Sequence, residues 1–216
     1  MTTHPTRAPR SLAWAAMALT IMALAAFAAV GCASTGQSPG TTSPQASTSS
    51  ADPGLLEARL SAIDDAVNRW RSATDLPAAQ RAAEEARNLT VGPSGPSYAD
   101  ANRDGTVDGA SAIGLLPGLG GEPGLATATA GPCVERDVLG GSWADPAARW
   151  SSLESAIAAW TPSNNTFPAL PSHPQRIVGW ASLALATAEL AAALEYGGHA
   201  SLHVDVARRA VTDCAG

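Results

Sequence analysis

The residues between Asp100 and Asp108 carry more oxygen donors in a shorter space than any other part of this 216-residue chain. Asp100, Asn102 and Asp104 alternate along the sequence, and Gly105 follows them directly. A hard cation such as Ca²⁺ takes about six to eight oxygen ligands, and a tight turn brings alternate side chains to one point. Glycine permits such a turn because it adopts positive φ at little cost. The spacing therefore predicts a calcium-binding loop.

The run also resembles the first nine positions of an EF-hand loop. That resemblance implies the following calcium ligands: Asp100, Asn102, Asp104, the carbonyl of Thr106, and Asp108 either directly or through water. The twelfth position, which normally holds a bidentate carboxylate, is Ser111. The resemblance therefore implies that the site borrows an acid from elsewhere, uses water, or binds weakly.

The loop is similar to the solitary calcium loops of secreted proteins and to one half of a dockerin repeat. The wider segment 87–118, which is 32 of 216 residues, resembles a segment of uncharacterised secreted bacterial proteins and implies no activity. The preceding GPSGPSY sequence cannot form a helix, so a complete EF-hand is not expected. The alternative interpretation is a surface turn that caps itself through side-chain to backbone hydrogen bonds and binds no metal.

Residues 1–31 have the pattern of an export signal, with Arg7 and Arg10 ahead of an apolar run that ends in small residues. The sequence Ala29-Val30-Gly31-Cys32 resembles a bacterial lipobox, which implies cleavage before Cys32 and attachment of lipid, including palmitate, to its thiol. An uncleaved membrane anchor is the alternative. The expected protein is exported and lipid-anchored to the cell membrane, on its outer-surface or periplasmic side.

Residues 32–53 then form a tether of small and polar residues, which cannot bury a core and is expected to be disordered. The whole chain has a formal net charge of −6, and removal of Arg7 and Arg10 with the signal would make it more acidic. A nucleic acid is therefore not an expected partner, and the lipid is expected to hold the protein at the membrane.

Residues 54–216 are expected to form an all-α bundle of four to five helices with one long loop, residues 90–144. Apolar residues from Leu56 to Trp70 recur at helical spacing. Further helices are predicted at 76–88 after the cap Asp75, at 146–160 after the cap Asp145, at 175–196 ending at Gly197 and Gly198, and at 199–214. The last helix is expected to turn Leu202, Val206, Ala210 and Cys214 toward the core.

Setting Cys32 aside leaves Cys133 and Cys214, and an even number of cysteines in an exported chain predicts one disulfide. A free, reactive thiol pair is the alternative. The glycine-rich stretch after the acidic loop lacks both a preceding strand and the Lys-Ser/Thr of a phosphate-binding loop. Trp143, which lies among glycines, is the tryptophan best placed to contact a ligand.

No sequence motif indicates catalysis, so a non-enzymatic helical module that binds a protein or other envelope partner is the leading hypothesis. His199 and His203 lie four residues apart, so a lipoprotein that captures a small ligand or a metal on this face is the alternative. An envelope hydrolase ranks below both.

Overall fold

The apolar stripe of the first helix builds the centre of the core. In the computed structural model, which describes residues 53–129, 131–163, 165–167 and 169–216, these five side chains are at most 2% exposed: Leu56, Leu60, Ile63, Val67 and Trp70. The indole nitrogen of Trp70 donates a hydrogen bond to the carbonyl of Ala193, 2.7 Å away. The predicted stripe is therefore confirmed.

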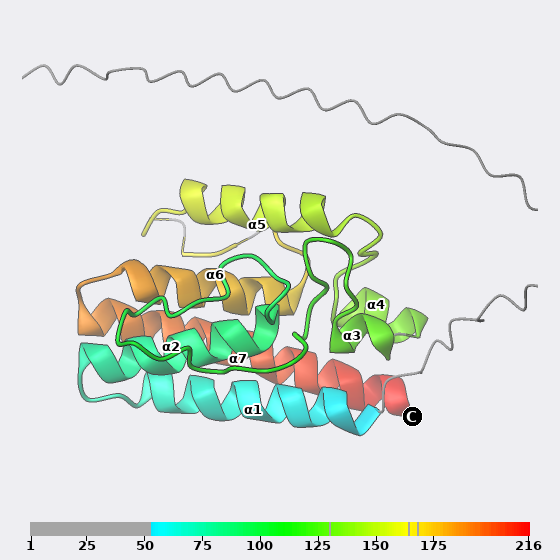
Figure 1. The fold of residues 1–216 in the computed structure, drawn as a ribbon, viewed down its shortest axis with the longest axis horizontal. Coiled ribbons are helices and arrows are strands. Elements are labelled where there is room, and N and C mark those ends of the chain that lie inside the picture. Colours follow the sequence, from blue (N-terminus) through cyan, green and yellow to red (C-terminus); the bar gives the residue numbers. More distant parts are fainter. Residues whose placement is uncertain (1–52, 130, 164, 168) are drawn as a thin grey trace, which may run out of the picture. The chain divides into compact units, whose positions relative to one another are not determined.

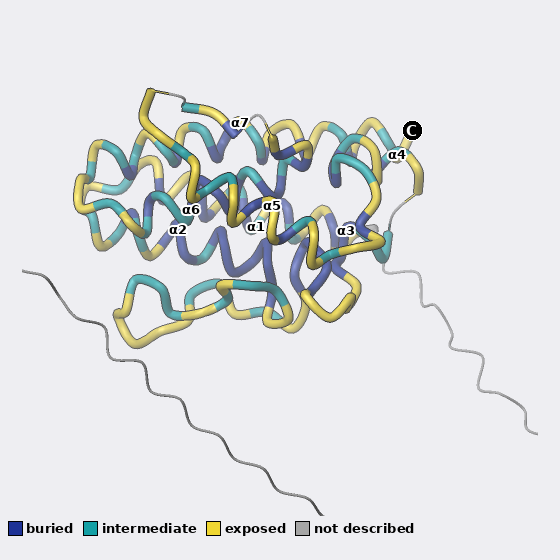
Figure 2. Tube along the Cα trace, turned by 90° about the horizontal axis from the view of Figure 1, so that it is seen from above, coloured by how far each residue is buried: buried dark blue, intermediate teal, exposed yellow. Residues whose placement is uncertain are grey.

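Every regular element in the described residues is a helix, which confirms the all-α prediction. The helices are α1 (Pro53–Arg71), α2 (Leu76–Val91), α3 (Leu125–Ala128), α4 (Pro132–Asp137), α5 (Pro146–Ala159), α6 (His173–Ala186) and α7 (Leu190–Ala215). Helices α1, α2, α6 and α7 pack against one another as a four-helix bundle, and α5 lies along α6 (Figure 1). Figure 2 shows that buried positions recur along the helices, while exposed positions lie on the loops and on the outer sides of the helices.

The predicted caps start two of these helices. The side chain of Asp75 accepts a hydrogen bond from the amide of Ala78 at 2.8 Å, and that of Asp145 accepts one from Ala148 at 3.0 Å. Each cap satisfies an amide that the first helical turn leaves without a partner. A proline in each first turn has no amide hydrogen to satisfy and has a backbone angle suited to a helix.

The predicted boundary at Gly197 and Gly198 is wrong, because α7 runs through both glycines and the break falls after Ala186. A Cβ atom at position 197 would lie 3.3 Å from the backbone of Arg71, so the glycine lets α1 and α7 approach closely. At the actual break, Gln80 donates its side-chain amide to carbonyls of residues 184, 185 and 187, at 3.4, 3.3 and 3.1 Å. That contact comes from a distant helix, so local sequence does not reveal it.

The predicted inner face of the last helix is wrong at Leu202 and Val206, whereas Ala210 and Cys214 are partly buried against the core. Leu202 is 61% exposed and Val206 is 42% exposed. The buried stripe runs instead through Ala193, Gly197, Ala200, Val204, Ala207 and Val211. Small residues dominate this stripe, and they allow α7 to pack close to its neighbours.

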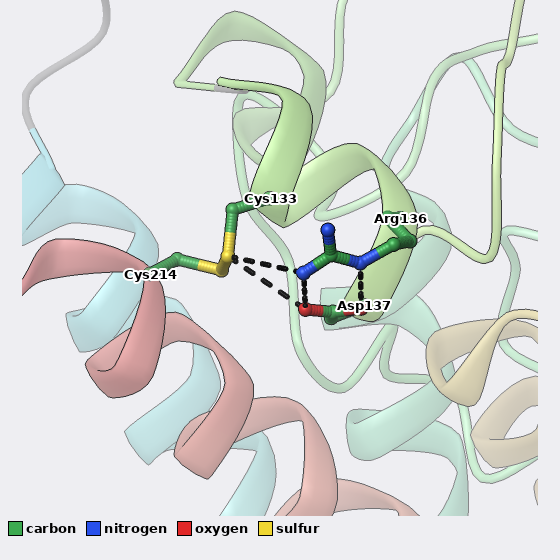
Figure 3. The surroundings of a disulfide bond; sticks show 4 residues. All are labelled: Cys133, Arg136, Asp137 and Cys214. Carbon is green, nitrogen blue, oxygen red and sulfur yellow. Dashed lines mark hydrogen bonds and ion pairs between the residues drawn. A yellow bond between two sulfur atoms is a disulfide. The ribbon is translucent and has the colours of Figure 1, made fainter.

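The predicted disulfide joins Cys133 on α4 to Cys214 near the end of α7, with the Cα atoms 5.6 Å apart (Figure 3). An ion pair between Arg136 and Asp137 lies beside it at 2.6 Å. The two cysteines are 81 residues apart, so the cross-link stabilises the fold by about 4 to 5 kcal/mol if it acts mainly on the entropy of the unfolded chain.

The long loop is paired to the end of α2 and is not irregular throughout. The amides of Leu115 and Leu116 donate to the carbonyls of Leu89 and Thr90 at 3.3 and 3.0 Å, and both leucines are buried. The short helices α3 and α4 follow. Trp143 is 7% exposed, and its ring packs edge-on against Trp150 with the ring centroids 5.4 Å apart. It is therefore a core residue, and the predicted ligand contact is wrong.

None of the described helices is both long and apolar enough to cross a membrane. The predicted signal, the predicted lipidation site Cys32 and the predicted tether lie outside the described residues, apart from Pro53.

Candidate calcium loop

The acidic loop folds around the side chain of Asp100. Its Oδ1 accepts a hydrogen bond from the amide of Asp104 at 3.1 Å, and its Oδ2 accepts one from Gly105 at 2.9 Å. The side-chain oxygen of Asn102 also accepts from Asp104, and Oδ1 of Asp104 accepts from Thr106 at 3.0 Å. Gly105 has a φ of 93°, a conformation that glycine adopts without steric cost. Alternate side chains therefore point into the same turn, as the sequence predicts.

A buried carboxylate on α2 attaches this loop to the helix by hydrogen bonds. Glu84 is 0% exposed, and its Oε2 accepts hydrogen bonds from the amides of Ala101 and Asn102 at 2.7 and 2.9 Å. Its Oε1 accepts from the amide of Asp108 at 3.0 Å. Hydrogen bonds to a charged acceptor are about twice as strong as neutral ones. Glu84 thus ties both ends of the acidic loop to one point on the helix.

Asn88, one helical turn further along α2, reinforces the attachment. Its side-chain amide donates to the carbonyls of Ala99 and Asp108, at 3.1 and 2.7 Å. Gly109 approaches the same helix so closely that a Cβ atom there would lie 2.5 Å from the carbonyl oxygen of Glu85. The backbone between 99 and 109 is therefore fixed to one face of α2.

Two of the predicted ligands have altered acidity. A hydrogen bond from Arg81, whose Nε lies 3.2 Å from Asp104 Oδ2, and one from the amide of Thr106 lower the pKa of Asp104. The pKa of Asp108 is raised by burial first, and then by the charges of Asp104 and Glu84. Asp108 Oδ2 is buried and has no hydrogen-bond partner. The charge of Arg81 lowers this pKa only in part, and no basic side chain pairs directly with Asp108 among the described residues.

All five predicted ligands lie in this loop, but the oxygens of its carboxylates are not close enough together to surround one ion. Among the described residues, the group of three acidic, histidine or cysteine side chains with ligand atoms within 4.8 Å of one another is Cys133, Asp137 and Cys214. These two cysteines form the disulfide, so they are not free thiolate ligands. The side-chain to backbone bonds of the loop are those that a self-capping turn requires. They are equally compatible with a calcium loop, whose ligands occupy the same positions.

Sequence reasoning missed the role of Glu84. The adjacent acid Glu85 turns to the surface instead and pairs with Arg69 at 2.6 Å. The available signal was the spacing of Glu84 and Asn88, two polar residues four apart on an alanine-rich helix next to the loop. Their partners are backbone amides and carbonyls, which leave no trace in the sequence.

The two histidines predicted as an alternative metal face turn to different partners. His199 stacks on Trp180, with ring centroids 4.4 Å apart, and its Nε2 lies 2.8 Å from the side-chain nitrogen of Asn165. His203 Nδ1 lies 3.1 Å from Nδ1 of His173 on α6. The structure therefore does not bring His199 and His203 together as a chelating pair.

The contact between His173 and His203 has the geometry of a hydrogen bond. The ring centroids are 5.3 Å apart and the nitrogens 3.1 Å, so both nitrogens lie close to the line between the ring centres. Two ligands of one metal would instead both point at a third position. Burial lowers the pKa of His203 to about 3, with further contributions from His173, Arg176 and His199. Burial and Arg176 also lower the pKa of His173.

No protein-family model matches this chain, and no curated protein or solved structure is significantly similar to it.

Acidification is expected to destabilise the fold through the histidine pair. An unfolded histidine takes up a proton near pH 6.5, whereas folded His203 stays neutral down to about pH 3. The unfolded state therefore binds more protons below pH 6.5, and the free energy of unfolding falls as the pH drops. Chemical denaturation at pH 7.5 and 5.0 should show this loss, and the loss should be smaller in His203→Gln. An equal loss in both proteins would contradict this assignment.

Proposed function

We propose that this chain is an exported, lipid-anchored envelope protein whose non-enzymatic helical module presents a calcium-stabilised loop to a partner. Export and anchoring are inferred from Arg7, Arg10 and the Ala29 to Cys32 sequence. The tether of residues 33–53 has room to hold the helical module roughly 25 Å from the anchor.

One observation carries the calcium proposal, namely the buried Oδ2 of Asp108, which has no hydrogen-bond partner in an acidic turn. Buried carboxylates are normally paired, hydrogen-bonded or bound to metal. A calcium ion would neutralise Asp108 together with Asp100 and Asp104, and would also use oxygens of Asn102 and Thr106. Because Ser111 replaces the twelfth carboxylate and accepts a hydrogen bond from Arg59, we expect an affinity of about 10⁻⁴ to 10⁻³ M, as in extracellular modules.

Arg81 is the natural competitor of the ion. Its guanidinium pairs with Asp104 and already supplies positive charge at the rim of the loop. Calcium binding would have to displace this side chain or use the other oxygen of Asp104. The charge of Arg81 would therefore lower the affinity for the ion.

The exposed edge of the loop is the surface we propose for partner binding. Residues 103–107 are exposed, while Glu84 and Asn88 hold the backbone beneath them. A loop that is already ordered loses little conformational entropy when it binds. The alternative, capture of a metal or small ligand by His199 and His203, receives less support because the two rings contact different residues.

Calcium titration tests the proposal for the loop. Isothermal titration of calcium into the chain from residue 33 should give heat of binding. Thermal melting should give a higher melting temperature with calcium than with a chelator. Asp100→Asn should abolish both effects. Arg81→Gln should tighten binding, because it removes the competing charge. Asp213→Asn is a matched control, since this acid is exposed and lies far from the loop in sequence. Absence of binding in both the wild-type and the Arg81→Gln proteins would exclude calcium.

Membrane attachment is tested separately through Cys32. In a bacterial host, the full chain should incorporate labelled palmitate and sediment with membranes. Cys32→Ser should lose the label. Equal labelling of the two proteins would contradict lipidation at this residue.

A further inference from the structure

The outer face of α7 carries a regular stripe that is exposed at most of its positions, although His199 stacks on Trp180 and Asn165 contacts both His199 and Glu195. The stripe consists of Glu195, Gly198, His199, Leu202, Asp205, Val206 and Arg209. These positions repeat every seven residues, which is the spacing of a seam between two packed helices. Leu202 and Val206, at 61% and 42% exposed, are the large apolar side chains of this face. These two apolar side chains lie four residues apart, so they are neighbours on the exposed side of the helix.

Residues at equal distances before and after Leu202 have complementary charge or size. Glu195 lies seven residues before Leu202, and Arg209 lies seven residues after it. His199 lies three residues before, and Asp205 three residues after. Gly198 and Val206 lie four residues to either side. Each acid thus has a basic counterpart at the mirrored position, and the glycine has a bulky one.

We propose that this stripe is a homodimer interface in which the α7 helices of two copies pack antiparallel about a two-fold axis at Leu202. Because both helices rise by the same amount per residue, mirrored positions then lie at the same height. Glu195 of each copy faces Arg209 of the other, and the two Leu202 side chains meet at the axis. Such an interface is isologous, as in most homodimers.

The charges favour a second copy in this orientation. The side chains of Arg209 and Asp205 make no hydrogen bond or ion pair with any described residue, so both can pair across an interface. Glu195 accepts a hydrogen bond from Asn165 and keeps its charge and its second oxygen for such a pair. A parallel arrangement would place Glu195 against Glu195 and Arg209 against Arg209, which is repulsive. An unrelated partner would give no reason for the mirrored pattern.

The surface shape agrees with this orientation. A Cβ atom at Gly198 would meet nothing within 4 Å, so the space above it is open to the layer of Asp205 and Val206 from the other copy. Beside Val206 and Arg209 lies a surface hollow of about 450 Å³, also lined by Pro171 and His173. Asn165 contacts Glu195 and His199. Glu195 and His199 of one copy lie opposite Arg209 and Asp205 of the other in the antiparallel dimer. Asn165 of the second copy therefore lies level with the hollow beside Arg209.

Cysteine cross-linking of the full chain in membranes tests whether the two-fold axis passes through Leu202. Leu202→Cys should form a disulfide with its own copy, because only a residue at the axis lies opposite itself. Val206→Cys is the matched control on the same face, since the two copies of residue 206 would be separated by about 12 Å along the helix axes, too far for a disulfide. A dimer band on a non-reducing gel is expected for Leu202→Cys and not for Val206→Cys. Equal bands, or no band with Leu202→Cys, would overturn the proposal.

Charge reversal in the Leu202→Cys background tests the orientation. Glu195→Arg and Arg209→Glu should each lower the dimer association constant by about tenfold or more, because each places like charges opposite each other. The double reversal restores the pairs and should recover the cross-linked fraction. All of these positions are exposed, and unchanged melting temperatures would verify that the variants fold. A double reversal as poorly cross-linked as the single ones would exclude the antiparallel pairing.

Discussion

The ordering of the acidic loop depends above all on one buried carboxylate, that of Glu84. Three backbone amides of the loop converge on it, and without these bonds a charged side chain would stay buried in the bundle with too few partners. The same hydrogen bonds serve both partners, because the loop amides satisfy the buried carboxylate and the carboxylate fixes the position of the loop backbone. The acidic side chains above it are consequently presented by a backbone that is already in place.

The bundle provides the rigid base for this arrangement. Helix α2, which carries Glu84 and Asn88, packs against α1 and α6, and Ala79, Ala83 and Ala86 bring it close to them. The Cys133–Cys214 disulfide fixes the far end of the long connection to α7. The long segment between α2 and α5 is therefore held at its beginning by α2 and near its end by a covalent bond. The side of α7 that faces away from the core remains open for a second molecule.

Local patterns predicted the features that depend on local physics. The spacing of apolar residues predicted α1, the caps Asp75 and Asp145 predicted two helix starts, and the number of cysteines predicted the disulfide. The misses involve contacts between distant segments. Gln80 ends α6 from another helix, Gly197 continues α7 because of its contact with α1, and Glu84 binds loop amides that any sequence possesses. For the acidic loop, the alternation of oxygen donors predicted the turn, but the pairing of Arg81 with Asp104 could not be read from it.

Amide hydrogen exchange in the presence of a calcium chelator tests the role of Glu84 most directly. The amides of Ala101, Asn102 and Asp108 should exchange slowly in the metal-free protein, because the carboxylate of Glu84 accepts all three. Glu84→Gln should speed the exchange of these amides, whereas Glu85→Gln, which changes the neighbouring surface acid, should leave them protected. Fast exchange of all three amides in the metal-free wild type would contradict the account, since it would mean that Glu84 alone does not order the loop.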